Sequence, residues 1–241
     1  MYHRTLLAAI TVVLVTSVSA AVADEKLDAL EKEIAAKWKQ VNSMTADMNM
    51  TMESDQGGMK MKHTMKVKVE YLRKGEKMLS RMEGEMVMLM DMGGQKNTMK
   101  TPFLAVSDGE FTHSLVEQMG QKMCTKAKAD ENSLTGEAMF KSLREQYELT
   151  LADDEEVDGE KCWVVQGKPK MAAQPGQPVK MVFYVRQKDA ATVQMIGYDA
   201  SDKKVMTTTY RDIKFNEKLD PKRFEFEVPE GVQVMDMTNR P

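Results

Sequence analysis

Methionine and histidine side chains at alternate positions are the residues of this sequence whose types and spacing could do chemistry. The chain contains 24 methionines, and 14 of them fall between Met44 and Met99. Many recur at every second residue, which in a β-strand places them on one face. Thioether sulfur is a soft ligand suited to Cu(I), and the unbranched side chain also adapts to flexible apolar ligands. The sequence therefore suggests two kinds of binding site, one for a soft metal ion and one for a flexible apolar ligand. The simpler alternative is that the methionines only fill a core.

A soft-metal site would centre on His63, which shares a strand face with three neighbours, Met59, Met61 and Met65. Residues at i and i+2 on a strand lie roughly 6.5 to 7 Å apart, because each residue advances the strand by about 3.3 Å. Such a site would therefore need donors from neighbouring strands. No Cys/His cluster has the spacing of a common metal site. A periplasmic Cu(I)-binding protein is kept as the alternative function, and no resident cofactor is predicted.

The preferred interpretation is a hydrophobic cavity for lipid or acyl chains. Methionine specifies packing poorly, so natural cores use it sparingly, and its repeated use favours a surface that adapts to a ligand. Three consecutive predicted strands, over 44–52, 59–71 and 78–92, carry these residues. The predicted cavity is lined by Met48, Met50, Met52, Met61, Met65, Val67, Val69, Met82, Met86, Met88 and Met90, with Trp38 and Phe140 packing over it from helices.

No catalytic residues are predicted. The sequence lacks the nucleophile-elbow, zinc-protease, P-loop and dinucleotide-binding fingerprints. The densest carboxylate cluster is Asp153-Asp154-Glu155-Glu156, which directly precedes the turn residues Asp158 and Gly159. A solvated acidic turn is the better interpretation of that cluster, so the sequence favours a binding protein over an enzyme.

The elements that must position these residues are mostly strands. Leu27, Leu30, Ile34, Trp38 and Val41 recur at steps of three and four, which predicts one amphipathic helix near the start. Long apolar–polar alternation then predicts antiparallel hairpins, interrupted by a second helix over about 134–146. The predicted fold class is mainly β with two helices. About eleven strands would form an incomplete antiparallel β-barrel, with the helices covering its open face.

Residues 1–23 are predicted to be a signal peptide. Arg4 gives a positive start, Leu6 to Val15 is an apolar run, and Ala21-Val22-Ala23 offers a cleavage site. The protein is therefore expected in the periplasm, with residues 24–241 as a single domain. Without Arg4 the chain carries 33 basic and 37 acidic residues. That mildly acidic balance argues against nucleic acid as a partner.

Two cysteines, Cys124 and Cys162, remain in the exported chain. An oxidising compartment and an even number make a disulfide one alternative. The other is a pair of buried thiols that act as small apolar side chains. Both cysteines lie in predicted strands, and the sequence leaves the two alternatives open.

Two segments resemble the periplasmic lipoprotein carriers, LolA and its relatives. The first is LAVSDGEF (Leu104–Phe111), and the second is LDPKRFEFEVPEGVQVMD (Leu219–Asp236). The resemblance implies an eleven-stranded unclosed barrel with helices as a lid over a hydrophobic cavity. It also implies that this cavity binds the acyl chains of lipoproteins, and that the protein carries them between membrane-bound donor and acceptor proteins toward the outer membrane. The resemblance further implies a lid contact for Arg73, although Lys74 and Gly75 follow here where the family has proline. A solvated hairpin arginine is the alternative for Arg73, and a lipid-sensing regulatory domain of the same fold is an alternative for the whole protein.

Overall fold

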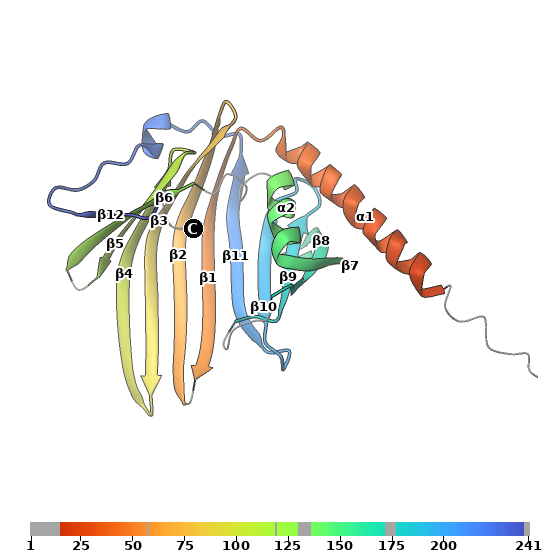
Figure 1. Ribbon diagram of the computed structural model, residues 1–241, viewed down its shortest axis with the longest axis horizontal. Coiled ribbons are helices and arrows are strands. Elements are labelled where there is room, and N and C mark those ends of the chain that lie inside the picture. The colour runs from red at the N-terminus through yellow and green to blue at the C-terminus, as the bar shows by residue number, and fades with distance from the viewer. Residues whose placement is uncertain (1–14, 57, 119, 130–135, 172–176, 239–241) are drawn as a thin grey trace, which may run out of the picture.

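The computed structural model describes residues 15–56, 58–118, 120–129, 136–171 and 177–238 (Figure 1). Twelve strands of this part of the chain form one sheet, in the order β12-β6-β5-β4-β3-β2-β1-β11-β10-β9-β8-β7. The elements are α1 (Val15–Trp38), β1 (Ser43–Gln56), β2 (Met59–Lys74), β3 (Lys77–Met92), β4 (Gln95–Ser107), β5 (Phe111–Gln118), β6 (Gln121–Lys128), α2 (Gly136–Gln146), β7 (Tyr147–Val157), β8 (Glu160–Pro169), β9 (Lys180–Arg186), β10 (Thr192–Tyr198), β11 (Lys204–Phe215), the 3₁₀ helix η1 (Pro221–Phe224) and β12 (Val234–Asp236).

The predicted fold class is confirmed: the protein is mainly β, with a largely antiparallel, open and curved sheet and two α-helices. The strand number differs slightly from the prediction, because a twelfth strand, β12, pairs with β6 in parallel. Hairpin patterns predict only antiparallel neighbours, so they could not indicate this strand. The start of the helix predicted over 134–146 lies outside the described residues, and α2 is described from Gly136.

The cross-strand register defines two faces of the sheet. Met50, Thr208, Met195, Phe183 and Val165 lie opposite one another across β1, β11, β10, β9 and β8. They therefore share one face, which we call the inner face. Helices α1 and α2 pack on the β7–β11 part of this face, as Figure 1 shows. The main hydrophobic core forms there, between the helices and the sheet.

The helical stripe predicted from the sequence is buried in this core. Leu27, Leu30, Ile34, Trp38 and Val41 are all buried. They pack with Val165, Phe183 and Val185 of the sheet and with Phe140 of α2. The Trp38 ring meets the Phe215 ring edge to face, with 6.0 Å between the ring centroids. Spacing of three and four thus identified the covered side of α1.

The opposite, outer face is polar along β2 and β3 and is crossed by the C-terminal strap, which we define as residues 216–238. Arg223 Nε donates to Glu70 Oε2 at 2.8 Å, and the Glu70 side chain is almost fully buried. Phe224 is buried beside them. Farther along, the Phe226 ring stacks on His113 with 4.9 Å between centroids. The strap then ends in β12, so it ties the end of β11 to the far edge of the sheet.

Cys124 and Cys162 are both free and buried. Cys124 lies on β6 and Cys162 on β8, near opposite ends of the strand order. The disulfide alternative is therefore wrong for this structure, and the alternative of two buried thiols holds. Eight strands lie between β6 and β8, and adjacent strands are about 4.8 Å apart, whereas a disulfide requires Cα atoms within about 7 Å.

Residues 1–14 of the predicted signal peptide lie outside the described residues. The predicted cleavage site Ala21-Val22-Ala23 falls within α1. Among the described residues, no helix is both long enough and apolar enough to cross a membrane.

Candidate ligand-binding site

An apolar pocket of about 370 Å³ opens on the methionine-rich strands. It is lined by six methionines and one imidazole, with small or β-branched side chains from the same strands and from β5. The lining residues are Met50, Met52, His63, Thr64, Met65, Met86, Val87, Met88, Met99, Thr101 and Val116. We call this site the methionine pocket. None of the lining side chains that the structure describes carries a fixed charge.

Cross-strand register brings these residues together. Met52 of β1 lies opposite His63 of β2, His63 lies opposite Met88 of β3, and Met88 lies opposite Met99 of β4. The next row on the same face runs from Met50 through Met65 and Met86 to Thr101. Directly opposite side chains in a sheet have Cβ atoms about 4.5 to 5.5 Å apart, so each residue contacts its neighbour in the row. The pocket is therefore a product of four paired strands.

The methionine pocket lies on the inner face, beyond the area that the helices cover. Met44 and Ala46 at the start of β1 belong to the helix-covered core, whereas Met50 and Met52 farther along the strand are only half-buried. Figure 1 shows the lower ends of β1 to β4 projecting past α2. One continuous face thus passes from a closed core under the helices to an open apolar surface.

The structure divides the predicted cavity residues into four groups. Met50, Met52, Met65, Met86 and Met88 line the methionine pocket. Four others share the inner face by register but do not line it: Val67 and Val69 are buried, and Met48 and Met82 are half-buried. Met61 and Met90 line a separate pocket of about 450 Å³ near the hairpin ends. Charged residues such as Glu53, Lys62 and Asp91 line that second pocket, so it is not an apolar cavity.

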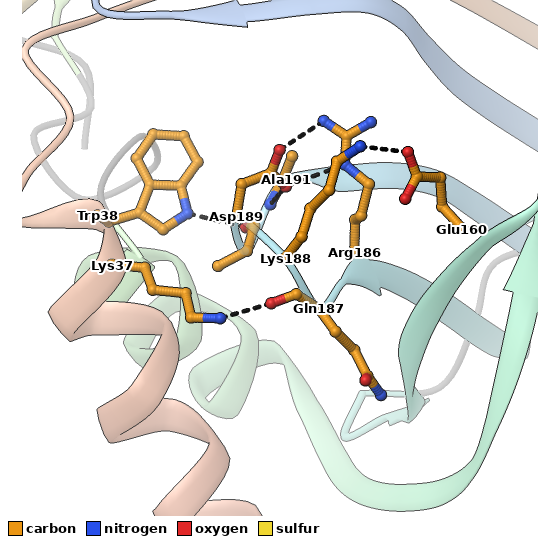
Figure 2. Close-up of polar contacts among 9 residues, drawn as sticks. Lys37, Trp38, Glu160, Arg186, Gln187, Lys188, Asp189 and Ala191 are labelled. Atoms are coloured by element: carbon orange, nitrogen blue, oxygen red, sulfur yellow. Dashed lines mark hydrogen bonds and ion pairs between the residues drawn. The ribbon is translucent and has the colours of Figure 1, made fainter.

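Trp38 and Phe140 form the fourth group, and they lie in the helix-covered core rather than over the pocket. Figure 2 shows how the end of α1 is held there. Trp38 Nε1 donates to the Ala190 main-chain oxygen at 3.0 Å, and Lys37 Nζ donates to the main-chain oxygen of Gln187. Arg186 and Asp189 pair within the same turn. These contacts fix α1 to the β9–β10 turn. Trp38 and Phe140, which were expected over the cavity, both pack in the core and do not line the methionine pocket.

Arg73 contacts the covering helix, as the family resemblance implied. Its Nε donates to the Val41 main-chain oxygen at 3.0 Å, and its Nη2 donates to the Trp38 main-chain oxygen at 3.2 Å. Trp38 ends α1, so the guanidinium satisfies carbonyl groups that a helix C-terminus leaves without partners in the helix. Its positive charge also favours that end of the helix dipole. Arg73 is therefore bound to the helix end and is not a solvated hairpin arginine.

Two tyrosines lie on the inner face beside the helix-covered core. Tyr71 and Tyr210 both pack against the core. Burial, together with the neighbouring Tyr210, raises the pKa of Tyr71 above its ordinary value. Burial likewise raises the pKa of Tyr210. Both phenols therefore stay neutral at physiological pH, in keeping with the apolar core that they pack against.

The four residues named for a soft-metal site, Met59, Met61, His63 and Met65, do not line one common pocket. Of the four, only His63 and Met65 line the methionine pocket. Met61 lines the charged neighbouring pocket, and Met59 lies opposite Met92 at the hairpin end. The described residues contain no group of three or more His, Cys, Asp or Glu side chains that could hold a metal ion. Any metal bound here would therefore depend on methionine sulfur from several strands.

Sequence reasoning missed five lining residues, which are Thr64, Val87, Met99, Thr101 and Val116. The last three come from β4 and β5, where alternation of apolar and polar residues is weak. Met99 has Asn97 and Thr101 at the i−2 and i+2 positions, and only the register of β3 with β4 places it opposite Met88. That register depends on the Gly93-Gly94 turn, and the methionine pattern alone did not supply it.

Comparisons with known proteins identify the fold more clearly than the function. A family model described as an uncharacterized protein matches residues 125–228, which is less than half of the chain. An uncharacterized protein of Methanocaldococcus jannaschii is 22% identical over 174 residues, covering 64% of this chain and 48% of that protein. The chain thus spans about half the length of the curated relative it matches.

A solved structure of an uncharacterized conserved protein from Thermus thermophilus has the same fold. It aligns with a TM-score of 0.53 and 11% identity, over 88% of this chain and 99% of that one. The Mycobacterium tuberculosis lipoprotein LppX aligns with a TM-score of 0.45 and 14% identity, over 82% of this chain and 99% of its own. The lower score supports no conclusion about function, and the resemblance to lipoprotein carriers stays a proposal.

Proposed function

We propose that this protein is an exported, non-catalytic carrier that binds an acyl chain of a lipid or lipoprotein in the methionine pocket. The observation that carries the proposal is an uncharged pocket of about 370 Å³ on the open part of a sheet face whose other part forms a closed core. Its volume lies within the range of small-molecule sites, about 300 to 1,000 Å³. Membrane-bound donor and acceptor proteins in the periplasm would be its partners.

The lining of the methionine pocket suits an acyl chain better than a polar ligand. Six methionines can change rotamer around an unbranched chain, because each has three rotatable bonds and a polarizable sulfur. Burying about eight methylene groups would contribute about 6 kcal/mol, at about 0.8 kcal/mol for each group. That gain exceeds the cost of ordering a few methionine side chains, at about 0.5 to 1.5 kcal/mol each. Affinity would therefore rise with chain length until the pocket is full.

The position of the pocket also suits a carrier. An acyl chain longer than the pocket would continue along the inner face toward Val67 and Val69, where the covered core begins. Helix α1 covers that core and is held at its end by Arg73. The family resemblance of the LAVSDGEF and C-terminal segments supports the same interpretation. The head group would stay in solvent, available to a membrane-bound partner.

Titration with a fluorescent fatty-acid analogue tests this proposal. We expect saturable binding with one site per chain, displaced by unlabelled fatty acids more strongly as their chains lengthen. Met86→Lys places a charge in the pocket wall and should weaken binding at least about tenfold. Met171→Lys adds the same charge at a methionine that is 84% exposed, so it should leave binding unchanged.

A second pocket variant keeps the test valid if Met86→Lys fails to fold. Val116→Trp narrows the pocket from β5 without adding a charge, and it should also weaken binding while the far-ultraviolet spectrum and the melting temperature are retained. The proposal is wrong if the purified protein binds no acyl probe, or if both pocket variants bind as the unaltered chain does.

A further inference from the structure

We propose that Met52, His63 and Met88 form a binding site for one soft monovalent metal ion, Cu(I) or its redox-inert analogue Ag(I). These residues occupy one row across three adjacent strands, with His63 directly opposite both methionines. The site shares the methionine pocket but does not rest on the proposed carrier function. It is a new set of donors, because a single strand offers no compact group.

The cross-strand arrangement solves the spacing problem that a single strand presents. Along β2, the side chains next to His63 on its own face are about 6.5 to 7 Å away. Across the sheet, directly opposite Cβ atoms are only about 4.5 to 5.5 Å apart. Met52 and Met88 flank His63 from both sides at this shorter spacing. Both methionines have three rotatable bonds, so their sulfur atoms can turn toward an ion bound to the imidazole.

The chemistry of the lining selects soft ions. Among the described residues, no carboxylate lines the pocket. Thioethers and one imidazole are the main donors there, and two threonine hydroxyls are the side-chain oxygens of the described lining. Ca²⁺ and Mg²⁺ need several oxygen ligands, and Zn²⁺ sites use thiolate, imidazole or carboxylate. Thioether ligands instead favour Cu(I). The donor set therefore points to a monovalent soft cation.

The absence of charged donors in the proposed site also favours a monovalent over a divalent ion. Met52, His63 and Met88 are neutral donors when the imidazole is unprotonated, so they do not compensate the charge of a bound ion. The desolvation cost of an ion grows with the square of its charge, which makes a divalent ion about four times as costly as a monovalent one in the same apolar surroundings. An uncharged pocket thus discriminates against divalent ions as well as against hard ones.

His63 is available to act as a ligand. Within the described part of the chain, its imidazole has no hydrogen-bond or ion-pair partner, and the ring is half-buried against the pocket. His113, by contrast, stacks on Phe226 of the C-terminal strap on the outer face. His63 can therefore turn a ring nitrogen to an ion without giving up a contact with the described residues.

Competition with a chromophoric Cu(I) chelator under anaerobic, reducing conditions tests the proposal on the purified full chain, with Ag(I) titrated separately by calorimetry. We expect one ion per chain, and no binding of Zn²⁺ at comparable concentration. Met52→Leu, Met88→Leu and His63→Ala should each raise the dissociation constant at least about tenfold. Met171→Leu removes the sulfur of a methionine far from the pocket and should leave the dissociation constant unchanged.

Nuclear magnetic resonance distinguishes direct ligands from residues that only maintain the structure of the pocket. On adding Ag(I), the methyl resonances of Met52 and Met88 and the ring resonances of His63 should shift together and saturate at one equivalent. The proposal is overturned if no ion binds, if binding survives the Met52→Leu/Met88→Leu double variant, or if the shifting resonances belong to other methionines.

The metal and acyl proposals fail separately. Leucine conserves the apolar volume of methionine, so the Met52→Leu/Met88→Leu double variant should lose the metal and keep the acyl probe. Val116→Trp should lose the acyl probe while its three metal donors remain in place. An unaltered chain that binds only one of the two ligands rejects the other proposal alone.

Discussion

Arg73 donates a hydrogen bond from its guanidinium to the main-chain oxygen of Trp38, 3.2 Å away, and so joins β2 to the last residue of α1. The same strand carries His63 and Met65 into the methionine pocket. The indole Nε1 of Trp38 donates a second hydrogen bond, to the main-chain oxygen of Ala190 in the β9–β10 turn. Two elements far apart in the strand order are thus connected through the end of one helix.

Removal of this contact should loosen α1. Arg73→Ala removes the guanidinium donor from the Trp38 and Val41 carbonyl groups, and the Trp38 oxygen keeps the Val41 main-chain N–H as a donor. Hydrogen bonds that involve a charged group contribute about 1.5 to 3 kcal/mol. We therefore expect the free energy of unfolding to fall by about 2 kcal/mol in urea titrations. Arg211→Ala removes an arginine that is 71% exposed and 3.8 Å from its partner Asp158, so its effect should stay below about 0.5 kcal/mol. Equal effects of the two substitutions would contradict this account.

The C-terminal strap should depend on the pair formed by Arg223 and Glu70. Glu70 is almost fully buried, and among the described residues Arg223→Ala would leave its carboxylate with Lys68 alone, whose Nζ lies 3.4 Å away. A loss of about 1 to 3 kcal/mol is expected, because a buried acceptor loses a charged donor. Hydrogen exchange should accelerate along β12 and the strap before the rest of the sheet. Lys222→Ala, at an exposed neighbouring position, is the matched control, and accelerated exchange in that variant would count against a specific role for Arg223.

Alternation and helical spacing were sufficient to predict both helices, every strand except β12, and the inner side of α1 and of β1 to β3. The Met48, Met50 and Met52 series lies on one face as predicted, because the side-chain period of a strand is two whatever its neighbours are. Strand neighbours outside consecutive hairpins could not be predicted in this way. β1 pairs with β11, and β12 pairs with β6, through contacts between segments that are far apart in the sequence.

The site was predictable only in part, for the same reason. Five of its methionines were expected, but the extent of the pocket depends on where the helices stop covering the sheet. Trp38 lies in the closed core because Ala190 and Phe215 hold it there, and neither contact is visible in the spacing of α1. The need for glycine at position 84 was also not predictable. A Cβ at that position would lie 2.0 Å from the Lys66 main-chain oxygen, so β2 and β3 approach closely at that point. The methionine pattern around Gly84 gives no indication of this approach.

The two thiols should be unreactive in the folded protein. Burial raises the pKa of both Cys124 and Cys162, so neither forms much of the reactive thiolate at neutral pH. We expect reaction with Ellman's reagent to be at least about tenfold slower in buffer than in urea. Without reductant, two thiols per chain should titrate in urea, and one in Cys124→Ser. A chain that releases thiols only after reduction would instead contain a disulfide, against the structure.

Asp108 should make the hairpin between β4 and β5 sensitive to acid. Burial alone would raise the pKa of its carboxyl group, but hydrogen bonds from the main-chain N–H groups of Phe111 and Glu110, both at 2.8 Å, together with the charge of Lys77, hold that pKa below its ordinary value of 3.8. A carboxyl group with a lowered pKa in the folded state stabilises the protein above its unfolded-state pKa, and this contribution disappears as the pH falls through the folded-state value.

The stability difference between the unaltered chain and Asp108→Asn should therefore be constant from about pH 7 to about pH 5 and shrink below about pH 4. Urea titrations across this range measure the difference, and the Asp108 carboxyl resonance gives its pKa directly. Asparagine keeps the size of the side chain and a weaker acceptor, so the pH dependence isolates the charge. A difference that grows in acid would mean that the folded state raises the pKa of Asp108, and the hydrogen bonds to this turn would then not stabilise its charged form.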